Sequence, residues 1–141
     1  MKKVAVLTSL LAAAVFAVFS FATVAVAFPP LPDDLNIVQP DPNLPKELAA
    51  FSGKWEGRGE RREFFFIVEK IDEEKATLRL SHGFDWQTIP ARVVKEYGKW
   101  KIWFTGPYGQ AELIVRRGGK YLDFSTTMAG GSTGVILKRI N

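Results

Sequence analysis

The fold is decided by residues 99–116, which read KWKIWFT-GPYG-QAELIVR. In the first part, Trp100, Ile102 and Phe104 occupy every second position, and in the last part apolar residues again alternate with polar ones. Successive side chains of a β-strand point to opposite faces, so a period of two predicts a strand with one buried face. The Gly-Pro-Tyr-Gly stretch between the two parts is typical of a tight turn. These residues therefore predict two antiparallel strands that form a hairpin.

The same period of two continues on both sides of this hairpin, from residue 53 to the C-terminus. Short stretches rich in glycine or charged residues separate the alternating runs, as expected for turns. A meander of this length leaves two exposed edges unless it closes on itself. We therefore expect an all-β fold, an antiparallel up-and-down meander closed into a small barrel, with a flattened sandwich as the alternative. The runs predict about eight strands, at residues 53–60, 63–71, 75–81, 86–96, 99–105, 110–117, 120–128 and 133–140.

The N-terminus has the three parts of a secretory signal peptide. Lys2 and Lys3 precede an apolar stretch that ends in small residues at Ala25 and Ala27. We expect residues 1–27 to be removed by a cut after Ala27, or alternatively after Ala22. An uncleaved membrane anchor is the other interpretation, because the apolar run is long enough to cross a hydrocarbon core of ~30 Å. Both interpretations predict an exported protein, periplasmic or extracellular, that meets a membrane only through this segment if it stays attached.

Two further segments follow the leader. Residues 28–45 contain six of the eight prolines and predict an extended, unpaired stretch. This stretch is either a spacer that holds the domain away from the export site or a segment that lies along the domain. Residues 46–141 form the barrel domain, which a short helix at 46–51 precedes, and we expect Leu48 and Phe51 on this helix to plug one end of the barrel.

Charge and composition exclude several classes of function. The formal charge of +4 includes Lys2 and Lys3, so the remainder carries about +2, and its arginines are interspersed with glutamates. Nucleic-acid binding needs a single-sign stripe, so we expect no nucleic-acid partner. The chain has no cysteine and a single histidine, His82, so we expect no disulfide, metal or cofactor.

Gly53-Lys54-Trp55, directly after the short helix, resembles the start of the calycins, the group of lipocalins and avidins. The resemblance implies that Gly53 and Trp55 lie at the closed end of the barrel and that an arginine of the last strand packs over the indole. Arg139, on the predicted last strand, is the candidate for that arginine, and a cation over a tryptophan face contributes ~0.5–2 kcal/mol. The chain departs from these families in its length, its lack of a disulfide, and its lack of the residues with which avidins hold biotin. The resemblance therefore implies a fold and binding of a small molecule, without naming the ligand.

The alternation places many aromatic side chains inside the barrel. An eight-stranded barrel is just wide enough to be filled by its own side chains or to hold one small ligand, so both a pocket and a filled core remain open. On residues 63–71 we expect Phe64, Phe66 and Val68 to face inward and Phe65, Ile67 and Ile71 to face outward. An apolar outer face needs a cover, which is the N-terminal segment, the helix, or a partner in a homo-oligomer.

Three hypotheses for function follow. The first is a non-catalytic exported barrel that binds a small apolar or amphipathic molecule inside the barrel or at its mouth. The second is an interaction module with a filled core, which binds a protein or a cell-envelope glycan through surface aromatics. The third, an enzyme that uses His82 and Asp85, has weak support because neighbouring strand and turn residues point different ways, so we expect no catalytic residues. The residues expected to bind the ligand are Phe66, Trp86, Trp100, Phe104, Tyr108 and Phe124.

Overall fold

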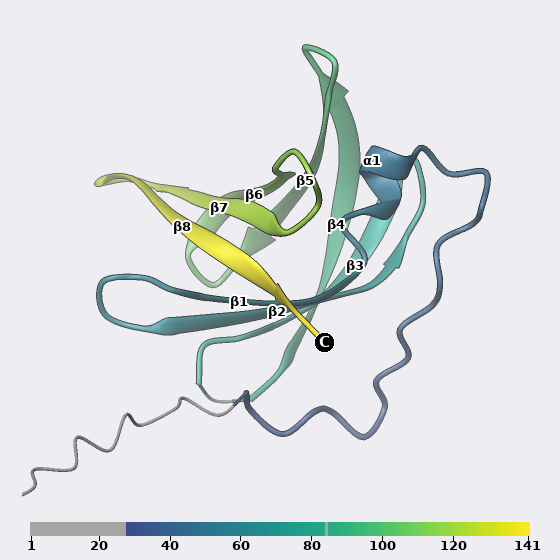
Figure 1. Cartoon of the computed structure of the whole chain (residues 1–141). Helices are drawn as coiled ribbons and strands as arrows, with labels where there is room; N and C mark the ends of the chain where they lie inside the picture. Colours follow the sequence, from purple (N-terminus) through teal and green to yellow (C-terminus); the bar gives the residue numbers. More distant parts are fainter. Residues whose placement is uncertain (1–27, 84) are drawn as a thin grey trace, which may run out of the picture.

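The computed structural model describes residues 28–83 and 85–141 and confirms the all-β barrel (Figure 1). Eight antiparallel strands follow one another in up-and-down order, and the first strand pairs with the last to close the barrel. The predicted leader, residues 1–27, lies outside the described residues. The elements are α1 (Lys46–Ala49), β1 (Gly53–Arg58), β2 (Glu63–Ile71), β3 (Lys75–Ser81), β4 (Gln87–Glu96), β5 (Lys99–Gly106), β6 (Gly109–Val115), β7 (Tyr121–Met128) and β8 (Gly131–Ile140).

The barrel is closed at the α1 end by Trp55 and the residues around it. Leu48, Phe51 and Trp55 are fully buried, and the Trp55 indole N–H donates to the carbonyl of Phe51 at 2.9 Å. The guanidinium of Arg139 lies 4.1 Å from the centre of the Trp55 ring. The same guanidinium donates to the carbonyls of Gly119, Ser52 and Ala50, so it ties β8 to the chain that leads into β1.

The inside of the barrel is filled by side chains from every strand. The aromatic residues Phe64, Phe66, Phe104 and Phe124 lie in one group at its centre, each less than a tenth exposed. Phe66 and Phe124 have ring centroids 4.8 Å apart, and Phe64 and Phe124 have ring centroids 5.2 Å apart. Edge-to-face pairs at these distances pack as in a dense core.

Strand β2 is buried on both faces, and one residue of it points opposite to the expectation. Ile71 was predicted to face outward, but it belongs to the core, because the pairing of β2 with β3 shifts by one residue between Val68 and Lys70. This β-bulge at Glu69 reverses the alternation for the rest of the strand. Phe65 and Ile67 do face outward, yet both are buried.

The N-terminal segment, residues 28–45, lies against the outside of the barrel. The ring of Phe28 packs on Phe65 with centroids 5.0 Å apart, and the N–H of Val38 donates to the carbonyl of Glu69 at 2.8 Å. Of the two interpretations of this segment, the structure shows the one in which it covers the apolar outer face of β2. Within the described residues, no helix is both long and apolar enough to span a bilayer.

Candidate functional site

The six residues expected to bind a ligand do not form one site. Phe66, Phe104 and Phe124 lie together in the filled core. Tyr108 lies at the open end of the barrel, where its ring meets that of Phe64 at 5.9 Å. Trp100 lines a hollow near α1, and Trp86 lies outside the barrel.

The open end of the barrel holds a hollow of about 450 Å³, which we call the mouth pocket. Phe64 and Phe124 form its apolar floor, where the core ends. Thr126 and Thr133 face each other across β7 and β8, with hydroxyl oxygens 3.0 Å apart. Ligand pockets usually measure about 300–1,000 Å³ and combine an apolar lining with a few polar groups, which describes this hollow. Its lining consists of residues 59–62, Phe64, Tyr108, Phe124, Thr126, Met128 and residues 132–135.

Arg62 and Tyr108 form the rim of the mouth pocket. The guanidinium of Arg62 lies 4.8 Å from the centre of the Tyr108 ring and donates to the Tyr108 hydroxyl. The Tyr108 ring also meets the ring of His82, with centroids 5.7 Å apart. Arg62 therefore places a positive charge at the rim of a hollow that Phe64 and Phe124 also line. Arg62 is exposed in the β1–β2 turn, and nothing in the sequence of that turn shows that it stands beside the β5–β6 turn.

Trp86 contacts the chain's own N-terminal segment. Its ring lies 5.5 Å from that of Phe28, and its indole N–H donates to the carbonyl of Pro30 at 2.7 Å. Both the ring and the indole N–H of Trp86 thus bind the chain's own N-terminal segment. Trp86 therefore fixes the segment that covers β2.

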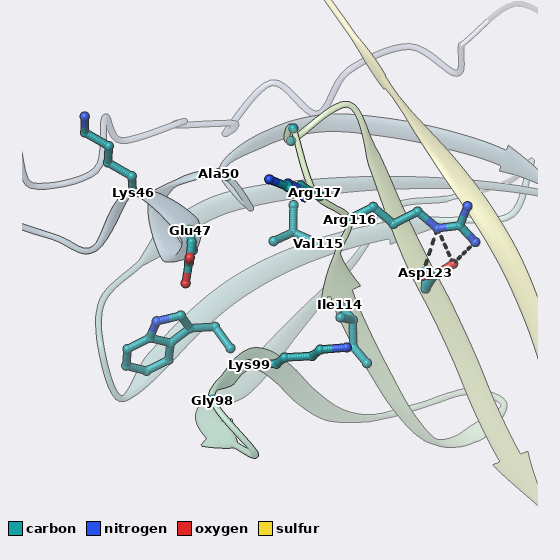
Figure 2. A pocket seen from close by; sticks show the side chains of 13 residues that line it. Lys46, Glu47, Ala50, Gly98, Lys99, Ile114, Val115, Arg116, Arg117 and Asp123 are labelled. Atoms are coloured by element: carbon teal, nitrogen blue, oxygen red, sulfur yellow. Dashed lines mark hydrogen bonds and ion pairs between the residues drawn. The ribbon is translucent and has the colours of Figure 1, made fainter.

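A larger hollow, of about 770 Å³, lies beside α1 between β5 and β6, and we call it the β5–β6 cleft. Figure 2 shows Glu47 projecting from α1 into it and Lys99 crossing toward Ile114. Arg116 and Asp123 also line it and form a bidentate ion pair with each other, with a shortest distance of 2.7 Å. The lining comprises Lys46, Glu47, Ala50, Gly98, Lys99, Trp100, residues 114–119 and Asp123.

Ion pairs on the outside of the barrel shift several pKa values. The hydrogen bond from Arg79, assisted by the N–H of Asn36, lowers the pKa of Glu69 against the opposing effect of burial. Ion pairing with Glu96, and further with Glu112, raises the pKa of Lys101. These charged groups are neutralised by partners within the fold. Arg62, Lys99 and Arg117, in contrast, form no ion pair with any other described residue.

Residues that could carry metal or catalytic chemistry are dispersed. Among residues 28–83 and 85–141, no three His, Asp or Glu side chains group closely enough to hold a metal ion. Ser81 is buried at the end of β3, while Asp85 is exposed in the loop that follows. Comparison of the chain with protein-family models, with curated proteins and with solved structures found no match.

Proposed function

We propose that this chain is an exported, non-catalytic, calycin-like barrel that binds a small amphipathic molecule at its open mouth. The observation that carries the proposal is the mouth pocket, which the charged Arg62, stacked on Tyr108, lines together with the rings of Phe64 and Phe124. The leader-like residues 1–27 support export. The stacking of Arg139 on Trp55 at the closed end supports the calycin-like assignment.

The filled core favours binding at the mouth over binding inside the barrel. Phe66, Phe104 and Phe124 occupy the interior and contact one another. A ligand there would have to displace packed rings, and removing a buried phenylalanine costs about 3–5 kcal/mol. At the mouth, the apolar part of a ligand would lie on Phe64 and Phe124, and its polar part would meet Arg62, Thr126 or Thr133.

The first test is a titration of the purified protein with 1-anilinonaphthalene-8-sulfonate, an amphipathic anion whose fluorescence rises in apolar surroundings. We expect Arg62→Ala to weaken binding at least tenfold, because a hydrogen bond to a charged group contributes about 1.5–3 kcal/mol. We expect Tyr108→Ala to weaken binding about fivefold, because an aromatic ring contact contributes about 1 kcal/mol. Native mass spectrometry of the protein from an exported expression would show a co-purified ligand.

The matched controls are Arg92→Ala and Tyr121→Ala, which remove an exposed arginine and an exposed tyrosine far from the mouth pocket. Both should leave the affinity unchanged. A protein that binds no probe, or whose affinity drops equally in the controls, would rule out the mouth pocket. An interaction module with a filled core would then be the better description.

A further inference from the structure

The barrel wall is open between β5 and β6 near α1. The pairing of these two strands ends at Ile102 and Leu113. Strand β5 nevertheless continues along β4 as far as Lys99, and β6 continues along β7 as far as Val115. In Figure 1 the β4–β5 hairpin projects beyond the rest of the barrel. Two strand edges therefore face the β5–β6 cleft without a partner strand.

The backbone groups on these edges point into the cleft. The N–H of Arg116 donates to the carbonyl of Tyr121 at 2.9 Å, so it points toward β7. Backbone groups of an antiparallel strand alternate in direction, so the N–H and C=O of Val115 point the opposite way, toward β5. The backbone groups of Leu113, two residues before Val115, also point toward β5, where Leu113 pairs with Ile102. The backbone groups of Ile102 therefore point toward β6, and so do those of Trp100, two residues before it.

The side chains that line the β5–β6 cleft combine an apolar floor with an excess of positive charge. Trp100, Val115 and Ala50 provide apolar surface, and Trp100 is half-buried. Lys46, Lys99 and Arg117 line the cleft without an ion pair among the described residues, while Glu47 is the opposing unpaired carboxylate there. Asp123 is already neutralised by Arg116.

We propose that the β5–β6 cleft binds an extended, acidic peptide segment of another protein by strand addition. The peptide backbone would take up the hydrogen bonds that Trp100 and Val115 offer, as in other complexes in which a peptide extends a sheet edge. Its acidic side chains would meet Lys99 and Arg117. A second copy of this chain fits less well, because pairing two β5 edges would bring the unpaired Lys99 side chains of both copies together, and lysines at an edge oppose such pairing.

The test uses the whole protein and an N-acetylated, C-amidated octapeptide of alternating valine and glutamate. We expect the peptide to change the backbone and indole NMR signals of Trp100 and the amide signal of Val115. The double variant Lys99→Ala/Arg117→Ala should weaken binding about tenfold, since two exposed ion pairs are lost. The matched control Arg92→Ala, at an exposed arginine of β4 that lines neither hollow, should leave the affinity unchanged.

Two altered peptides separate strand addition from simple charge attraction. A peptide with N-methylated valines keeps its charge but loses backbone donors, and a valine–lysine peptide keeps its backbone but reverses its charge. We expect neither to bind. The proposal is overturned if the valine–glutamate peptide causes no shifts at Trp100 and Val115, or if the N-methylated peptide binds as well. These outcomes are independent of the mouth pocket, which the sulfonate titration tests separately.

Discussion

At the scale of single residues, Arg139 shows how one side chain can close a barrel. Its planar guanidinium covers the Trp55 ring and donates to three carbonyls from two different loops. Desolvation at this position lowers the pKa of the guanidinium, which still remains charged. The pairing of β1 with β8 is short, so these contacts add to a closure that few backbone pairs maintain.

Replacing Arg139 by lysine should therefore destabilise the protein although the charge is kept. A lysine ammonium cannot reach three divergent carbonyls or stack as a plane, so we expect Arg139→Lys to lower the free energy of unfolding by about 2–4 kcal/mol. Urea denaturation followed by tryptophan fluorescence measures this loss. Arg92→Lys, at an exposed arginine of β4, is the control. Equal stabilities of the two variants would show that the contacts of Arg139 contribute little.

At the scale of elements, the bulge in β2 connects the barrel to its N-terminal segment. The extra residue at this point is Glu69, which faces outward and is nearly buried. Its carboxylate accepts from Arg79 and from the N–H of Asn36, both at 2.8 Å, and its carbonyl accepts from Val38. One irregular residue thus holds both β3 and the segment that covers β2.

This arrangement predicts a pH dependence of stability. Because Arg79 and Asn36 lower the pKa of Glu69 in the folded state, its contribution is complete above the unfolded pKa of about 4.3 and is lost as the pH falls below that value. We expect Glu69→Gln to lower the free energy of unfolding by about 1–3 kcal/mol at pH 7, and the difference from the wild type to shrink between about pH 5 and 3. Urea titrations across this range measure it. Glu73→Gln, in an exposed turn, should show no such convergence, and a pH-independent difference for Glu69→Gln would contradict the linkage.

At the scale of the whole molecule, the N-terminal segment forms an outer layer over β2, on the outside of the barrel. Phe28 and Trp86 meet at one end of the segment, and the Val38 N–H bonds to β2 further along. The segment has few contacts compared with the closed barrel, so it should open locally without unfolding of the barrel.

Removing the Phe28 ring should loosen this outer layer. An aromatic pair contributes about 1 kcal/mol, so we expect Phe28→Ala to raise the hydrogen-exchange rate of the Asn36 and Val38 amides about fivefold. Amides in β6 and β7 should keep their protection, which makes them the internal control. Unchanged exchange at Asn36 and Val38 would mean that the segment is held by its polar contacts alone.

The sequence by itself determined the eight strands, their up-and-down order and most of their inward faces, because the period of two is a local property of the chain. The inward positions of Trp55, Ile102 and Leu113 follow from it directly. The reversal at Ile71 could not be read in this way, since a bulge is set by pairing with the neighbouring strand. Only the tertiary structure decided that the core is filled, that residues 28–45 cover β2, and that Arg62 stands over Tyr108. Each of these depends on surfaces from segments far apart in sequence, and local periodicity carries no information about which distant surfaces meet.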